Sequence, residues 1–279
     1  MHARTSPIEE ARQLYLEQAD LARRLQLRPG EDAADSAPLV VWDVGLGAAA
    51  NAMAAIHCYE EQAVVGALRP LRLISFENDL DSLKLALARN DVFTYLRHGA
   101  AAGILRDGEW RSKRHPALEC LLAPGDFQQT MSKAPAAPDL IFYDLFSSNS
   151  DARSWTLEAF QRLFAVCAPR ATELFTYSFS TAARAALLVA GFHVAKGRNA
   201  GAVPETTIAL TPAALERGVA PQRELLSLDW LEKWNRSTAR YASDITPEEY
   251  PSFAAKVRGH PQFAHALPGE ERKNGSGGV

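Results

Sequence analysis

Two glycines and an acid follow the first strongly apolar run of the sequence. The run at 39–44 (LVVWDV) carries Asp43 near its end, and Gly45 and Gly47 come directly after it. Glycines at a strand end let the backbone pass close to a ligand at the carboxyl edge of a parallel sheet, where open α/β folds bind cofactors. We therefore expect Asp43 to hold an amino group of such a ligand, directly or through water. A plain tight turn between a strand and a helix would give the same pattern.

This glycine pattern is incomplete for a dinucleotide site. Dinucleotide-binding loops carry G-x-G-x-x-G, whereas here the turn continues with alanines and Asn51 in place of a third glycine. The third glycine allows the close packing that a pyrophosphate site needs, so its absence disfavours nicotinamide dinucleotides.

Two further acids follow apolar runs. Glu77 ends the run at 71–77 (LRLISFE), and Asp126, with Phe127 after it, follows the run at 117–124. A carboxylate after the second strand can accept both ribose hydroxyls of an adenosine cofactor. We expect Asp126 to accept the adenine amino group and Phe127 to pack on the ring. A surface acid at Glu77 and an ordinary turn at Asp126 are the alternatives, but three acids at three successive strand ends are more specific than any one.

The spacing of apolar residues predicts the elements that bring these side chains together. Strand-like runs alternate with helical ones, which predicts a mostly parallel sheet with helices on both faces. The last two runs lack a helix between them, so we expect a hairpin that places one antiparallel strand at the end of the sheet. This combination is typical of the Rossmann-like fold of methyltransferases that use S-adenosylmethionine (SAM). The expected strands are 39–44, 71–77, 117–124, 138–146, 171–179, 192–197 and 205–211, and expected helices include 79–90, 156–166 and 180–191.

A fourth acid, Asp144, lies near the end of the apolar run at 138–146 (PDLIFYDLF). The nearly continuous apolar residues predict a buried strand that delivers Asp144 to the open end of the sheet. Methyl transfer from a sulfonium is an in-line displacement, so the protein contributes mainly orientation and a nucleophile with a free lone pair. We predict that Asp144 holds an amine substrate and takes its proton. An Asp that caps the turn before Ser147 is the alternative.

With these residues in place, the sequence resembles the MnmC-like methyltransferase family. This family is the SAM-dependent half of the bifunctional enzyme that completes 5-methylaminomethyl-2-thiouridine at the tRNA wobble position. The similarity covers residues 8–211, and the segments that carry it are EEARQLYLEQADLARRL, GLGAAANAM, DLFSSNSDARSWTLEAF and FTYSFSTAARAALLVAGFHVAKG.

The resemblance implies a role for each matching residue. It assigns Asp43, Gly45, Gly47, Asn51, Glu77 and Asp126 to the cofactor pocket, and Asp144 and Phe146 to the catalytic loop. The sequence departs from the family where Leu145 and the residues after it replace Gly-Phe-Ala-Pro, and where Ala48 and Ala49 replace Gly or Thr. The family's basic segment is replaced by 198–205 (RNAGAVPE), and the residues after 211 are too few for the FAD-dependent oxidase half. These departures concern the substrate more than the fold or the cofactor.

Length and composition predict one main domain with extensions. With 279 residues, 47% of them hydrophobic and 23% charged, the chain can bury one substantial core. We expect an N-terminal helical extension at 1–38, the methyltransferase domain at 39–215, and a C-terminal helical extension at 216–279 with a disordered tail. No apolar run approaches the roughly 18 residues that a membrane span requires. The chain starts with charged residues where a signal peptide needs an apolar stretch, so we expect a cytoplasmic protein with no membrane partner.

The charge distribution and the cysteines indicate whether nucleic acid or a metal ion is to be expected as a partner. A net charge of -3 argues against binding nucleic acid by bulk electrostatics. Basic clusters at 23–28 and 106–115 are interpreted as ordinary solvated faces, although the second would favour RNA if it lay beside the cofactor pocket. The three cysteines, Cys58, Cys120 and Cys167, are widely spaced and form no CxxC pair, so no metal site is expected.

Three functions remain open at this point. The first is a SAM-dependent N-methyltransferase that acts on an aminomethyl group, with a modified uridine of tRNA as the leading substrate. The second is the same chemistry on a small-molecule or peptide amine, which the acidic balance favours. The third is a SAM-binding interaction protein without catalysis, against which the presence of Asp144 argues.

Overall fold

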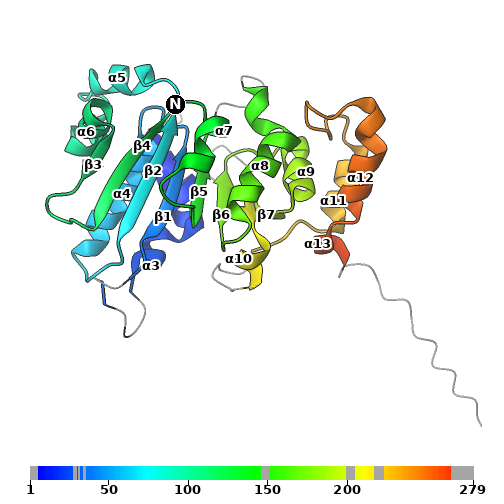
Figure 1. The fold of residues 1–279 in the computed structure, drawn as a ribbon, viewed down its shortest axis with the longest axis horizontal. Helices are drawn as coiled ribbons and strands as arrows, with labels where there is room; N and C mark the ends of the chain where they lie inside the picture. Colours follow the sequence, from blue (N-terminus) through cyan, green and yellow to red (C-terminus); the bar gives the residue numbers. More distant parts are fainter. Residues whose placement is uncertain are drawn as a thin grey trace, which may run out of the picture.

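The computed structural model describes residues 6–27, 30, 32–33, 36–145, 151–198, 205–216 and 223–264. These residues form a single mixed sheet with helices on both faces (Figure 1). The strands follow one another across the sheet in the order β3 (Glu109–Arg111), β4 (Leu118–Pro124), β2 (Leu71–Glu77), β1 (Leu39–Val44), β5 (Leu140–Tyr143), β6 (Glu173–Thr176), β8 (Thr206–Leu210) and β7 (His193–Gly197).

The direction of the strands confirms the expected fold class. β4, β2, β1, β5 and β6 pair in parallel, and β7 and β8 form the expected terminal antiparallel hairpin. In this hairpin the reversed strand is β8, which lies between β6 and β7 and not at the edge of the sheet. At the opposite edge, β3 also runs antiparallel to its neighbour β4. All five residues of β8 are buried, while His193 and Lys196 of β7 are partly exposed. The more apolar strand therefore takes the inner position.

Alternate residues of the central strand enter two separate cores. Val41 belongs to the core on one face, and Val40 and Trp42 belong to the core on the other. This alternation follows from the twofold period of side chains along a strand. Every residue of β1 is buried, as expected for a strand covered by helices on both faces.

The first face is covered by the N-terminal segment and by the helices that follow β1 and β2. The elements that cover it are α1 (Pro7–Ala11), the π-helical segment η1 (Arg12–Leu16), α2 (Glu17–Ala19), α3 (Leu21–Leu25), α4 (Ala50–Ala63), α5 (Asp81–Leu87), the 3-10 turn η2 (Thr94–Arg97) and α6 (Gly99–Asp107). The N-terminal helical extension is interrupted at Asp20, whose φ of 53° is left-handed. Asp accepts this conformation more readily than most residues, and the chain turns there between α2 and α3.

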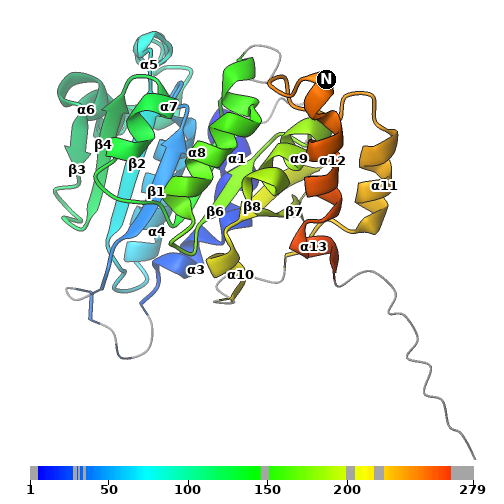
Figure 2. The same ribbon diagram turned by 45° about the vertical axis from the view of Figure 1, so that its right-hand side comes forward.

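The second face is covered by helices from the later half of the chain. It carries α7 (Phe127–Thr130), η3 (Met131–Lys133), η4 (Ala152–Trp155), α8 (Leu157–Cys167) and α9 (Thr181–Ala190), and Figure 2 shows α8 and α9 in front of the sheet and α1 behind it. Helix α8 begins at the cap Thr156, whose side chain accepts from the Ala159 amide, and it buries Phe160 and Leu163 against the sheet.

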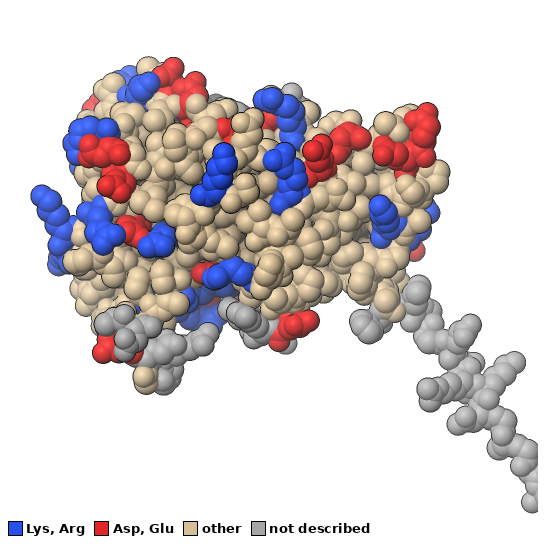
Figure 3. Space-filling view, viewed as in Figure 1, with Lys and Arg blue, Asp and Glu red and all other residues tan. Residues whose placement is uncertain are grey.

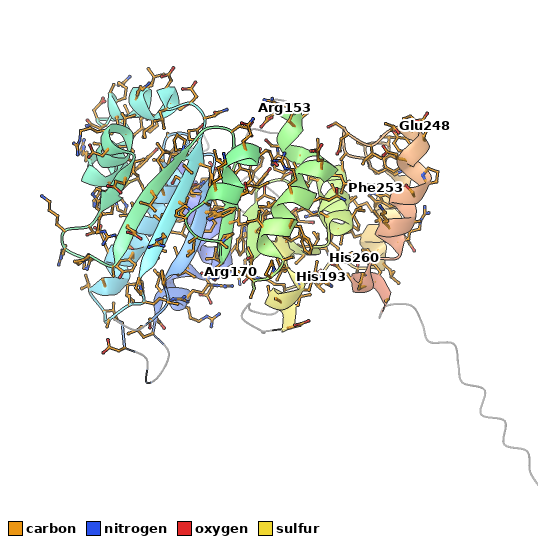
Figure 4. All side chains as sticks on the ribbon, in the orientation of Figure 1. Arg153, Arg170, His193, Glu248, Phe253 and His260 are labelled. Carbon is orange, nitrogen blue, oxygen red and sulfur yellow. The ribbon has the colours of Figure 1, made fainter. Side chains whose placement is uncertain are left out.

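The later C-terminal helices extend this second core. They are α11 (Leu228–Arg236), η5 (Pro247–Glu249), α12 (Tyr250–Arg258) and α13 (Pro261–Ala264). The short helix α10 (Pro212–Glu216) instead buries Ala214 in the first core. Trp234 and Phe253 are buried in the same core cluster as Trp42. Figure 4 shows Phe253 on α12, and below it the rings of His193 and His260, whose centroids lie 5.1 Å apart. The extension thus packs onto the edge of the sheet formed by β7.

The carboxyl ends of the parallel strands meet at one edge of the sheet. Figure 4 places Arg153 at this edge and Arg170 at the opposite one. Within the described residues, no helix has the length and apolar character needed to cross a bilayer. The strand ends, together with the loops that follow them, form the site described next.

Candidate active site

A cavity of about 380 Å³ opens at the carboxyl edge of β1, β2, β4 and β5. Most of the residues predicted for the site lie in its wall: Gly45, Gly47, Asn51, Glu77, Asp126, Phe127 and Asp144. Asp43 does not line it, and Phe146 lies outside the described residues. Four segments far apart in the sequence therefore converge on one hollow because parallel strands end at the same edge.

Both glycines of the first turn have backbone conformations that disfavour other residues. Gly45 has φ 93° and Gly47 has φ 51°. A Cβ on Gly45 would lie 2.8 Å from the backbone oxygen of Asp144, so only glycine lets the ends of β1 and β5 approach this closely. A Cβ on Gly47 would meet nothing within 4 Å, since this residue faces open space in the cavity. The first glycine is required by packing, and the second leaves room for a ligand.

The carboxylate of Glu77 is fixed at the mouth of this turn. Its Oε2 accepts from the Gly47 amide at 2.9 Å, and its Oε1 accepts from the Asn78 amide at 2.9 Å and the Asp79 amide at 3.2 Å. A carboxylate offers about four acceptor positions, two on each oxygen. Because Oε1 already accepts two amides, one position on Oε2 is left for a hydroxyl from the cavity. This position suits a hydroxyl of the ribose diol for which Glu77 was predicted.

The next acid and its neighbour form the far wall of the cavity. Asp126 caps α7 by accepting from the Gln128 amide at 2.8 Å. Phe127 is buried, with its ring centroid 4.9 Å from that of Phe76 and 6.1 Å from that of Trp42. A flat apolar surface beside an acceptor oxygen suits a purine ring that carries an amino group. Together with Glu77, these residues fit the adenosine part of SAM.

Asp43 takes a different position from the one expected of a ligand-binding acid. Its side chain is fully buried, and Oδ2 accepts from the Ser75 hydroxyl at 2.9 Å. Asp43 and Ser75 face each other across β1 and β2 in the sheet register. Burial raises the pKa of Asp43 to about 7, and its Oδ1 has no hydrogen-bond partner. Asp43 therefore lies behind the cavity wall, and its role in holding the amino group of a ligand stays a prediction.

Asp144 is held by two side chains from the first face of the sheet. The Tyr15 hydroxyl donates to Oδ1 at 2.8 Å, and the Asn51 amide donates to Oδ2 at 2.9 Å. Burial raises the pKa of Asp144 to about 6, although these two hydrogen bonds oppose the rise. The carboxylate is thus oriented at the cavity wall and titrates closer to neutrality than an exposed Asp.

Several residues of the site were not predicted. Tyr15 contacts Asp144 across 129 positions of sequence, and only the general likeness of the N-terminal segment to the MnmC-like family pointed to that region. Tyr177 comes directly after β6, and its hydroxyl donates to the backbone oxygen of Leu145, the neighbour of Asp144, at 2.9 Å. Arg153 and Ser154 line the cavity from η4, within the quoted segment DLFSSNSDARSWTLEAF.

The basic cluster at 106–115 lies at the β3 edge of the sheet and not beside the cavity. The hollow that it lines has no residue in common with the cavity at the strand ends. Arg106 pairs with Asp107 at 2.6 Å, and Arg111 pairs with Glu119. Figure 3 shows positive and negative side chains interspersed on this side of the molecule. The interpretation as a solvated face is the one that the geometry favours.

The thiols and acids do not gather around a metal position. Cys58, Cys120 and Cys167 are all buried and free. In the portion of the chain covered by the structure, no three His, Cys, Asp or Glu side chains are arranged to hold a metal ion.

Comparisons with known proteins agree with this site. Residues 109–212 match the model of a family described as S-adenosyl-L-methionine-dependent methyltransferase. The structure is similar to that of MnmC2 from Aquifex aeolicus, with a TM-score of 0.61 and 19% identity over 90% of this chain and 75% of that one. None of the curated proteins matches the sequence significantly.

Two further solved structures are more distantly similar. A putative class I SAM-dependent methyltransferase from Listeria monocytogenes has 14% identity and a TM-score of 0.42, over 92% of this chain and 73% of that one. A precorrin-6y C5,15-methyltransferase from Geobacter metallireducens has 16% identity and a TM-score of 0.37, over 69% of this chain and 86% of that one.

The fold and the family match define the class of protein: the chain is a SAM-dependent methyltransferase. Its fold is similar to that of MnmC2. The predicted enzyme class and cofactor are thereby confirmed.

Proposed function

We propose that this methyltransferase acts on the nitrogen of an aminomethyl group, with a modified wobble uridine of tRNA as its first substrate. The observation that carries the proposal is the position of Asp144. Its carboxylate is oriented by Tyr15 and Asn51 at the wall of the cavity that fits SAM. A carboxylate in this place suits a methyl acceptor that binds as an ammonium cation and transfers a proton to Asp144.

The chemistry requires an amine with a free lone pair. SAM supplies an electrophilic methyl group, so the protein must present the nitrogen in line with the breaking carbon–sulfur bond. Asp144 accepts a hydrogen bond from the bound amine and receives the proton as the N–H bond breaks and the N–C bond forms. A base is most effective when its pKa lies near the working pH. A pKa of about 6 therefore suits Asp144 better than the usual value for Asp would.

The tRNA substrate is supported by the resemblance of residues 8–211 to the MnmC-like family and by the MnmC-like fold. The test is an assay with tritiated SAM and tRNA that carries 5-aminomethyl-2-thiouridine at the wobble position. Incorporation of the label, followed by nucleoside analysis that finds the N-methylated base, would support the proposal. Fully modified tRNA is the matched control. The absence of transfer to undermodified tRNA would refute this substrate.

A second candidate substrate is the amine of a small molecule or peptide. The remote position of the basic cluster favours it, because Arg106 and Arg111 are paired with acids at the β3 edge, away from the cavity. Binding to RNA through phosphate contacts would weaken steeply as salt rises. Transfer to free 5-aminomethyluridine as fast as to tRNA, with no dependence on salt, would favour this second candidate.

The cofactor site has its own test. Calorimetric titration of the purified protein with SAM, followed by NADH, measures each cofactor separately. Saturable binding of SAM without binding of NADH is expected from the glycine turn and Glu77. Binding of NADH would show that the adenosine site is less selective than proposed.

A further inference from the structure

A second cavity, of about 320 Å³, lies on the other side of Asp144. It shares Ala50, Asn51 and Asp144 with the cofactor cavity, so the two cavities meet at these three residues. Its outer wall comes from α1 and the start of η1, which lie behind the sheet in Figure 2. An acceptor in this second cavity would reach Asp144 from the side opposite to much of the cofactor site.

The walls of this cavity suit a flat, uncharged body. Pro7, Ala11 and Leu14 supply apolar surface from the N-terminal segment, and Tyr15 and Tyr177 supply aromatic rings. The volume lies near the lower end of the range for small-ligand sites, which is roughly 300–1,000 Å³. A single ring with a short side chain can enter, while a charged backbone attached to the ring stays outside.

The charged residues that line the cavity are acidic. They are Glu10 and Asp144, and the lining, all of which the structure describes, includes no Lys, Arg or His. The charge of Glu10 also contributes to the raised pKa of Asp144, so the two carboxylates act on each other. Glu10 is exposed at the rim of the cavity and Asp144 is partly buried in its wall. Their like charges repel, and a cation between them relieves this repulsion.

We propose that this second cavity is the acceptor chamber and that Glu10 makes it selective for amines that carry no negative charge next to the nitrogen. This inference rests on the proposed amine methylation and specifies which amines qualify. Primary and secondary ammonium groups on a flat neutral ring are bound between Glu10 and Asp144. Amines that carry a carboxylate beside the nitrogen are excluded because the two acids repel it.

The test is a comparison of two benzyl amines, one of which carries an added carboxymethyl group. Benzylamine is a cation at neutral pH, and N-benzylglycine adds a carboxylate next to the same nitrogen. Binding of each to the protein saturated with S-adenosylhomocysteine is measured by calorimetry or by ligand-observed NMR. The wild type is expected to prefer benzylamine by about tenfold or more, as expected for one additional like-charge contact in a partly solvated space.

The Glu10→Gln variant tests whether Glu10 causes the preference for benzylamine over N-benzylglycine. It should reduce the preference by about threefold to tenfold, and Glu10→Lys should reverse it. Glu9→Gln is the matched control, because Glu9 is on the same helix and is exposed like Glu10, but contacts Gln13 at 3.0 Å instead of lining the cavity. Retained binding of S-adenosylhomocysteine shows that each variant is folded.

The outcomes separate this inference from the proposed function. A wild type that binds both probes equally, or that fails to bind benzylamine, overturns the charge-selective chamber. The same holds if Glu10→Gln leaves the preference unchanged. Selective binding of benzylamine by a protein that methylates no amine would retain the chamber and refute the proposed reaction. Methylation of amines without charge selection would refute the chamber alone.

Discussion

The two cavities that meet at Asp144 are built from different kinds of sequence. On the cofactor side, Gly47, Glu77 and Asp126 each follow directly after or end a strand, so the sheet alone places them. On the other side, Glu10 and Tyr15 come from a segment that reaches the sheet only through tertiary packing. The cofactor side can therefore be shared by many enzymes with this sheet, whereas the acceptor side depends on what precedes it.

The N-terminal segment is nevertheless part of the core. Leu21 and Leu25 are fully buried in the cluster that contains Val41. Arg24 forms a buried ion pair with Glu173 at the start of β6, and Arg223 pairs with the same carboxylate at 3.0 Å. Loss of Glu173 would leave two largely buried cations without this partner, which is strongly destabilising. The N-terminal segment that carries the wall of the second cavity is thus anchored to the sheet.

The largest effect is expected where both sides meet. Asp144→Asn removes the proton acceptor while keeping the shape of the side chain, so turnover should fall by about 10²–10⁴-fold. SAM affinity should stay within about twofold, because the residues that fit adenosine are unchanged. Steady-state kinetics and calorimetry measure the two quantities. Asp229→Asn, on the exposed surface of α11, is the control. Unchanged turnover would refute the role of Asp144.

A change on the cofactor side should affect binding alone. Glu77→Ala removes the acceptor for the ribose hydroxyls and the partner of the Gly47 amide, so the Kd for SAM should rise by roughly 10- to 100-fold, as for the loss of charged hydrogen bonds. Turnover at saturating SAM should remain close to the wild type. Glu232→Ala on α11 tests for nonspecific loss of charge. Undiminished affinity would mean that the ribose site lies elsewhere.

Much of the cofactor side could be predicted from sequence because its signals are local. The apolar runs at 39–44 and 71–77 became β1 and β2 with the same bounds, and Glu77 necessarily stands at a strand end. The orientation of Asp43 was not predictable in this way. The register between β1 and β2 places it opposite Ser75 and inside the sheet, and no local pattern encodes that register.

The acceptor side was less predictable because its contacts are distant in sequence. Tyr15 looks like one more apolar position of an amphipathic helix until the fold brings it to Asp144. The break at Asp20 could not be located for a related reason, since the segment suits one helix or a helix pair and nothing in the local sequence marks the turn. Strand β3 was missed because its three residues are too few to show a period.

A change on the acceptor side should alter catalysis without altering cofactor binding. Tyr15→Phe removes one of the two hydrogen bonds that orient Asp144, so kcat/KM for the amine should fall by about 5- to 30-fold, as for one buried hydrogen bond to a charge. The same hydrogen bond lowers the pKa of Asp144, so its loss should move the acidic limb of the pH profile upward. A variant with slower turnover and an unshifted limb would indicate a structural role only.

The smallest effect distinguishes the two buried acids. Burial raises the pKa of Asp144 to about 6, and only its ionised form can accept a proton. The value of kcat/KM should therefore fall as pH decreases through about 6, with a loss of about twofold between pH 7 and pH 6. Asp43 has a pKa of about 7 and does not line either cavity.

An acidic limb centred near pH 7 that Tyr15→Phe fails to shift would assign the pH dependence to Asp43. Asp144 would then not be the proton acceptor. A limb near 6 that moves upward in Tyr15→Phe would assign it to Asp144, because only Asp144 receives the hydrogen bond from Tyr15. The measurement is initial rate at low amine concentration and saturating SAM from pH 5 to pH 8. The basic limb, which reports deprotonation of the acceptor amine, serves as the internal reference because neither acid controls it.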